Sequence, residues 1–308
     1  MISNNLVARD AYYDGGNPYA WLYSTMALWI LTWIAATAIL ICTLVTVTRA
    51  TEPKHRWTSW FKGAFGVWVL FLTVEACFWI MYTVEINTSY DSAYDSDAYI
   101  RRVERLREAS EYVSDVTAFI RDCAVVATFL ALVHLGLDMA AAPRAVILKS
   151  WVFLLAGVLY MLSIAEFALD VIIGRQQIRR ERGHVYPYYE SDSFLALVKS
   201  EKGVTVAQQA LFEIAAITNL VWAVVVAVRG NGNGQSSKGS SSKAVTYYLV
   251  CSVLYLLHTS YALVVVVKAY YVYEEFRSYD IFLHLVFNGW PVTIIFTLLF
   301  VLARGRVL

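Results

Sequence analysis

The sequence predicts an all-α integral membrane protein, a single bundle of seven transmembrane helices with its N-terminus outside and its C-terminus in the cytoplasm. Three observations support this prediction. The 308 residues are 59% hydrophobic and only 16% charged, whereas soluble domains are about 45–50% apolar and about 25% charged. The mean hydropathy is +0.54. Seven separate stretches reach the roughly 20 apolar residues that a helix needs to cross a bilayer.

The seven predicted spans cover approximately 20–48, 60–84, 112–138, 148–173, 204–228, 244–270 and 280–303. The first and sixth are apolar runs with almost no charge. The second to fifth each contain charged residues, so their ends are less sharply marked. In the seventh, Pro291 is expected to kink the helix and to free the carbonyl of Phe287. The ten-residue alternation of a membrane β-barrel is absent.

The outer loops are predicted from their composition. Loop 85–111 contains DAYIRRVERLREASEYV, whose apolar residues recur at near-helical spacing. We therefore expect the third helix to project several turns beyond the bilayer. Loop 174–203 combines basic and tyrosine residues that suit contact with membrane lipids, and a short helix is expected around Phe194, Leu195 and Val198. Either loop could also contact a protein partner.

The orientation follows from the density of basic residues, which is highest in the short loops 49–62, 139–149 and 229–243 and in the tail 304–308. Short basic loops remain in the cytoplasm. The segment 229–243 is also predicted to be a flexible Gly/Ser linker.

The first 19 residues lack the features of a signal peptide. Asn87 begins an N-glycosylation tripeptide and falls on the outer side. The predicted location is the plasma membrane or an endomembrane.

Some ligand classes find no support in the sequence. The formal net charge of +1 gives no reason to expect nucleic acid as a partner. The five histidines form no HxxH, HxxxH or HExxH pair, so no metal site is predicted. No cofactor is predicted either.

The most informative residues are the ionisable ones inside the spans. A charge at the bilayer centre costs roughly 2.5–3.5 kcal/mol on insertion scales, so such residues usually face the bundle interior or a cavity. Counting about 1.5 Å per helical residue places most of them in one layer in the outer half of the bilayer. They come from six helices and are Glu75, Arg121, Asp122, Glu166, Asp170, Glu213, His258 and His284.

Helical spacing adds neighbours to this layer, because residues three or four apart share a face. Trp68, Glu75, Trp79 and Tyr82 lie together on the second span. Ser163, Glu166 and Asp170 share a stripe on the fourth span, and Thr205, Gln209 and Glu213 share one on the fifth. The predicted ligand-binding set is Trp68, Glu75, Trp79, Arg121, Asp122, Glu166, Asp170, Gln209, Glu213, Tyr255, His258, His284 and Asn288.

Two interpretations of the layer remain open. Arg121 can neutralise one or two carboxylates and form buried ion pairs that fix the helix packing. Alternatively, the layer lines a water-filled pocket that opens outward. Because the acids outnumber the single arginine, at least one carboxylate should be protonated, solvated or bound to a ligand.

Three functions fit such a pocket. The first is a receptor-like protein that binds a small or lipid-like ligand. Helix number and orientation are similar to those of G-protein-coupled receptors. That family's motifs are missing, because the third helix ends HLGLDM without a DRY-like triplet and the seventh carries NGWP in place of NPxxY.

The second function is a metal-independent intramembrane enzyme of cyclase or isomerase type. Glu75 would be the acid and Glu166 or Glu213 the second carboxylate. The third is a proton-coupled transporter, which ranks last because no inverted repeat is visible. Receptor-like binding ranks first, because the predicted topology supports it, and the enzyme follows closely.

Overall fold

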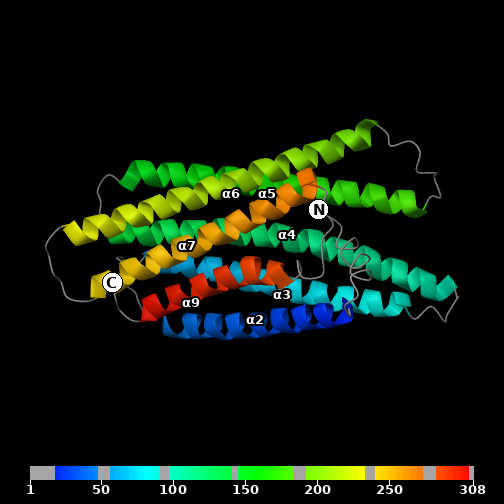
Figure 1. Cartoon of the computed structure of the whole chain (residues 1–308), viewed down its shortest axis with the longest axis horizontal. Helices are drawn as coiled ribbons and strands as arrows, with labels where there is room; N and C mark the ends of the chain where they lie inside the picture. Colours follow the sequence, from blue (N-terminus) through cyan, green and yellow to red (C-terminus); the bar gives the residue numbers. More distant parts are fainter. Residues whose placement is uncertain are drawn as a thin grey trace.

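The computed structural model describes residues 18–47, 56–90, 97–140, 145–182, 192–232, 240–272 and 282–304. The helices are α2 (Pro18–Thr46), α3 (Arg56–Tyr90), α4 (Asp97–Ala140), α5 (Ala145–Arg182), α6 (Asp192–Gly232), α7 (Ser240–Val267) and α9 (Trp290–Arg304), with π-helical turns η2 (Lys268–Val272) and η3 (Leu285–Gly289). Successive helices run in alternating directions along the long axis (Figure 1). Seven of the described helical segments are long and apolar enough to cross a membrane, so the predicted fold class is confirmed.

The outward face of the bundle is apolar. Leu31, Val45, Trp151 and Met161 expose 61%, 70%, 65% and 66% of their surface. In water each such side chain would lose the stabilisation of burial, about 25 cal/mol per Å², but in lipid the exposure carries no such cost. The helices satisfy their backbone hydrogen bonds internally, as lipid requires. The chain is therefore a multi-pass integral membrane protein, while its orientation stays a prediction.

The third membrane helix extends beyond its apolar span, as predicted. α4 begins at Asp97, and its extension packs along the end of α3. Ser110 Oγ donates to Glu85 Oε2 at 2.8 Å. Arg107 and Glu111, one turn apart, form an ion pair at 3.3 Å.

Two predicted segments differ from the structure. The residues around Phe194 form the first turns of α6 rather than a separate short helix, and α5 continues to Arg182. Each helix end leaves about four backbone groups unsatisfied, so lengthening two helices leaves fewer such groups than adding a third. Likewise, α6 and α7 take up both ends of the predicted 229–243 linker. Residues 1–17 and the predicted loop segments 91–96, 183–191 and 233–239 lie outside the described residues.

α4 is the central helix. It contacts α3, α5, α6 and α7 and runs through the middle of the bundle (Figure 1). Gly136 permits its close approach to α6 and α7. A Cβ atom at this position would lie 2.4 Å from Tyr248 Oη and 2.8 Å from Trp222 Cδ1.

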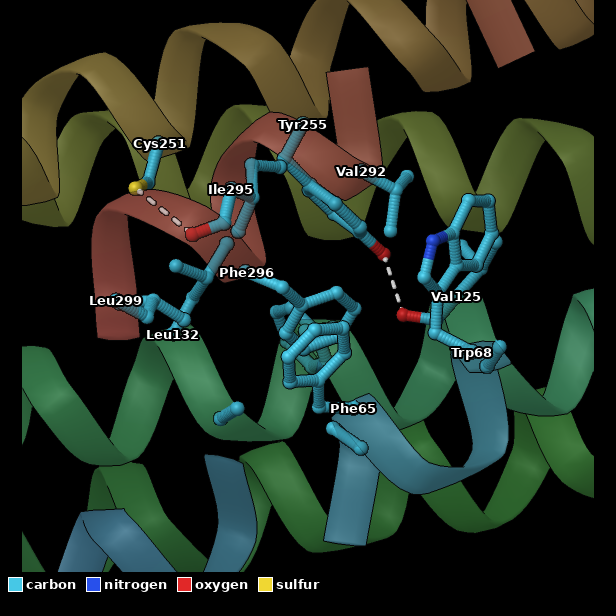
Figure 2. Close-up of a cluster of buried hydrophobic side chains, with 14 of the residues drawn as sticks. Phe65, Trp68, Val125, Leu132, Cys251, Tyr255, Val292, Ile295, Phe296 and Leu299 are labelled. Carbon is cyan, nitrogen blue, oxygen red and sulfur yellow. Dashed lines mark hydrogen bonds between the residues drawn. The ribbon is translucent and has the colours of Figure 1, made fainter. Parts of the chain in front are cut away.

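The hydrophobic core extends along most of α3, from Trp57 to Tyr82. In α4, α5, α7 and α9 the core residues lie within 124–135, 152–159, 244–255 and 292–302. Figure 2 shows part of it, where Phe65 stacks on Phe296 with ring centroids 4.8 Å apart. Asp122, Ser163 and His258 lie beyond this core in α4, α5 and α7 and are themselves buried. We call this part of the bundle, which holds the buried side chains of Asp122, Ser163 and His258, the polar half.

Candidate functional site

Arg121 is the electrostatic centre of the polar half. Its Nε and Nη2 atoms both contact Asp122 Oδ1 at 3.0 Å. Its charge also acts on Glu75 and Glu166 and reaches His258 and His284. The structure therefore brings together residues from α3, α4, α5, α7 and the helical turn before η3. We call this group, with its hydrogen-bonded partners, the Arg121 layer: Glu75, Arg121, Asp122, Ser163, Glu166, Thr205, Gln208, His258, His284 and Asn288.

A hydrogen-bonded corner of the layer joins α4, α5 and α6. Gln208 Nε2 donates to Asp122 Oδ2 at 2.6 Å and to Ser163 Oγ at 3.2 Å. One turn away, Thr205 Oγ1 donates to Glu166 Oε1 at 2.8 Å. Asp122 is thereby shared between the Arg121 guanidinium and the Gln208 amide. These hydrogen bonds connect α4, α5 and α6.

Gln208 is the layer residue that the sequence analysis missed. The predicted stripe joins Thr205 to Gln209 at i, i+4 spacing. The stripe that the structure shows joins Thr205 to Gln208 at i, i+3 spacing. Both spacings lie on one helix face. Gln208 and Gln209 are each buried, but it is Gln208 that reaches Asp122. The three-residue spacing from Thr205 was the available signal.

We predict that Gln208→Leu lowers the free energy of unfolding by about 2 kcal/mol. The substitution removes a hydrogen bond to a charged group and leaves Asp122 Oδ2 without this donor, a loss of roughly 1.5–3 kcal/mol. Thermal unfolding of the purified protein measures the change. Thr218→Val is the matched control, because Thr218 is exposed on the same helix and its hydroxyl bonds only the backbone of Ile214. Equal unfolding midpoints for the two variants would contradict the role assigned to Gln208.

Glu75 lies at the aromatic side of the layer. It is 7% exposed, and Trp79 Nε1 donates to its Oε1 at 2.9 Å. The Trp79 ring meets Phe78 and Tyr82 edge-on, with centroids 5.7 and 5.9 Å apart. A carboxylate held among rings on one helix is the arrangement that the sequence predicted for Glu75, Trp79 and Tyr82.

The third predicted carboxylate, Glu213, is bound to α7. Thr259 Oγ1 donates to its Oε2 and Ser260 Oγ to its Oε1, each at 2.8 Å. Both carboxylate oxygens thus have a hydroxyl donor from the neighbouring helix. Glu213 therefore joins α6 to α7, whereas Glu75 and Glu166 lie within electrostatic reach of Arg121.

Two predicted binding residues lie in the hydrophobic core. Trp68 is fully buried, and its Nε1 donates to Thr293 Oγ1 at 3.0 Å. Tyr255 Oη donates to the carbonyl of Val125 at 3.2 Å, as Figure 2 shows. Each uses its polar atom to bond a neighbouring helix, so both contribute to helix packing.

The two histidines of the layer, His258 and His284, lie at the π-helical turn η3. Asn288 Nδ2 lies 3.1 Å from His284 Nε2. The His258 ring interacts with the backbone of Phe287 and Asn288. Pro291 has no N–H and cannot bond the Phe287 carbonyl, so the predicted release of this carbonyl agrees with the contact to His258. The π-helical turn lies where a kink was predicted.

Four buried polar atoms of the layer have no hydrogen-bond partner among the residues that the structure describes. They are Glu166 Oε2, Gln208 Oε1, His258 Nδ1 and Asn288 Oδ1. Buried polar atoms without partners are rare and need a physical explanation. They lie on four different helical segments around Arg121.

The other predicted site residues are placed as follows. Asp170 on α5 is an electrostatic neighbour of Asp115 on α4. Asn87 is exposed near the end of α3, where its Oδ1 accepts a hydrogen bond from Tyr23 Oη at 3.1 Å, and its glycosylation stays a prediction.

Within the described ranges, no three His, Cys, Asp or Glu side chains are grouped to hold a metal ion. No protein-family model, curated protein or solved structure matches this chain.

Proposed function

We propose that this chain is a receptor-like membrane protein that binds a small or lipid-like ligand in the Arg121 layer. The observation that carries the proposal is the exposure of Arg121, whose side chain is 26% accessible. Arg121 belongs to the central helix, and its charged and histidine neighbours come from α3, α5, α7 and the turn before η3. The proposed ligand contacts this exposed part of the Arg121 side chain.

The chemistry of the layer supports a ligand rather than a purely structural ion pair. Arg121 contacts Asp122, so the surplus carboxyl groups Glu75 and Glu166 must be protonated, solvated or bound to a ligand, and we propose the last. A buried charge is normally paired or hydrogen-bonded. A ligand that supplies hydrogen-bond donors would satisfy Glu166 Oε2 and Gln208 Oε1 together.

An intramembrane enzyme is the second candidate, and it rests on Glu75. A carboxyl group held by Trp79 among aromatic rings is suited to protonate an apolar substrate, while ring faces stabilise a developing cation. No corresponding observation favours the proton-coupled transporter.

The test is mass spectrometry of small molecules that co-purify with the full-length protein and with Glu75→Gln, Glu166→Gln and Glu104→Gln. We expect a specific amphiphile in the wild type that is at least tenfold depleted in Glu166→Gln. Glu104 is exposed on the α4 extension, so Glu104→Gln should retain the molecule.

The outcomes separate the candidates. If Glu75→Gln retains a different molecule that the wild-type protein converts into the co-purified one, the chain is an enzyme. If the same molecules accompany all four proteins in equal amounts, the layer is a scaffold of buried ion pairs and the proposal fails.

A further inference from the structure

We infer that the protein binds an anionic phospholipid at the end of the bundle where α3 and α5 begin and α4 ends, with the lipid phosphate at Lys149 and His134. This site is separate from the Arg121 layer, because His134 follows Arg121 by 13 residues on α4, about 20 Å along the helix axis. The inference therefore goes beyond the proposed function and does not depend on it.

Three aromatic rings from three helices meet at this end of the bundle. The Trp60 indole on α3 stacks on the His134 imidazole on α4, with centroids 4.9 Å apart and an interplanar angle of 8°. Phe153 on α5 lies 5.7 Å from each of them. Trp60 and Phe153 are 37% and 39% exposed on the lipid-facing surface, whereas His134 is 7% exposed. We call these three residues, with Lys149 one turn before Phe153, the Lys149 patch.

The polar groups of the Lys149 patch supply hydrogen-bond donors and a positive charge. The Lys149 charge acts on the His134 ring. Within the described part of the chain, the side chains of Lys149, His134 and Trp60 have no hydrogen-bond or ion-pair partner. Asp138, one turn further along α4, accepts a hydrogen bond from the Trp57 backbone N–H at 3.4 Å. The complementary group is an anion with several acceptor oxygens, and a phosphate is such a group.

The surface deeper in the membrane suits acyl chains. Gly63 follows Trp60 by three residues on α3, and on α5 Gly157 follows Phe153 by four, so each lies one turn deeper on the same helix face. Both glycines are exposed, and nothing lies within 4 Å of a Cβ atom built on either. One turn beyond Gly157, Met161 is 66% exposed. A molecule that joins a phosphate to apolar chains matches both surfaces, which favours a phospholipid over a free phosphate.

The predicted orientation brings this ligand to the patch. The patch lies at the end that carries the basic loops 49–62 and 139–149, which are predicted to be cytoplasmic. Anionic lipids give the cytoplasmic leaflet its negative surface potential, and this potential attracts basic residues near the membrane. Tryptophan rings are also enriched at the membrane–water interface.

The test is a titration of the delipidated full-length protein with phosphatidylglycerol, followed by native mass spectrometry, with phosphatidylcholine as the zwitterionic comparison. We expect phosphatidylglycerol to bind more tightly. Lys149→Gln should weaken its binding about tenfold, because a charge-assisted hydrogen bond to the phosphate is lost. His134→Phe keeps a ring for the stack with Trp60 and removes both nitrogens, and it should weaken binding several-fold.

Lys199→Gln is the matched control. Lys199 is exposed near the start of α6, at the opposite end of the bundle, so its loss should leave the affinity for phosphatidylglycerol unchanged. Lys149→Gln should unfold at the wild-type temperature in nanodiscs of phosphatidylcholine alone. Its weaker binding of phosphatidylglycerol then reflects the lost contact and not a folding defect.

Three results would overturn the inference. Equal affinities of the wild type for the two lipids would exclude a preference for anionic lipid. Equal losses in Lys149→Gln and Lys199→Gln would indicate general surface attraction. If glycerol 3-phosphate binds as tightly as phosphatidylglycerol, the patch takes a soluble phosphate and the lipid is wrong.

The results also separate this inference from the proposed function. Glu166→Gln leaves the Lys149 patch intact and should retain phosphatidylglycerol, while it loses the ligand of the Arg121 layer. Lys149→Gln should show the opposite pattern. Either proposal can therefore fail while the other stands.

Discussion

Gly136→Ala is expected to lower the free energy of unfolding by about 2–6 kcal/mol. The new methyl group would lie 2.4 Å from Tyr248 Oη and 2.8 Å from Trp222 Cδ1. Tyr248 cannot move aside freely, because it is fully buried and its hydroxyl donates to Asn219 Oδ1 at 3.0 Å. Overpacking costs typically 1–3 kcal/mol, and breaking a buried hydrogen bond adds about 1–3 kcal/mol.

The measurement is the unfolding midpoint of the purified variant, with Gly157→Ala as its matched control. Gly157 lies on α5 with nothing within 4 Å of its hypothetical Cβ atom. Alanine is favoured over glycine in a helix by about 1 kcal/mol, so this control should be neutral or slightly stabilising. If Gly136→Ala matched Gly157→Ala, the close packing of α4 on α6 and α7 would be wrong.

Arg121→Gln is expected to cost about 3–5 kcal/mol. Asp122 is 4% exposed, and loss of the guanidinium would leave its buried charge uncompensated, a strongly destabilising change. Glu75 and Glu166 would lose the same cation. The double variant Arg121→Gln/Asp122→Asn should be more stable than the sum of the two single effects, because removal of both charges leaves neither unpaired.

A four-protein thermal unfolding cycle measures this coupling. Arg107→Gln is the control, because Arg107 pairs with Glu111 on the same helix but is 42% exposed. Exposed pairs contribute about 0–1 kcal/mol. Additive effects of Arg121→Gln and Asp122→Asn, or a loss no larger than that of Arg107→Gln, would show that the Arg121–Asp122 contact contributes little to stability.

The polar layer could be predicted because charges are so unfavourable in lipid. Glu75, Arg121, Glu166 and His258 had to face the bundle interior wherever their helices packed. Their sequence positions, counted from the ends of alternating helices, were enough to place them at a common depth. The structure confirms that they come together, and it adds that Arg121 is the residue whose charge reaches the others.

The partners within the layer could not be predicted in the same way. Gln208 and Gln209 differ by about 100° of helix rotation, and Thr205 is compatible with either. Trp68 was predicted to bind the ligand because it shares a helix face with Glu75, and Tyr255 was in the same predicted set, whereas both donate hydrogen bonds to neighbouring helices in the core. Glu213 has Thr259 and Ser260 as donors because α6 and α7 pack at that point.

The amino-acid sequence by itself determined the membrane class, the seven helices, the extension of the third one and the gathering of ionisable residues from several helices. Hydropathy and chain length suffice for these, because lipid excludes charges and unsatisfied backbone groups. Only the tertiary structure decided the central position of α4, the contact at Gly136 and the partners of each polar side chain. In a membrane both the lipid-facing and the helix-facing sides of a span are apolar. The rotation of each helix about its axis is therefore set by packing between helices. This packing leaves only a weak pattern in the sequence of any single helix.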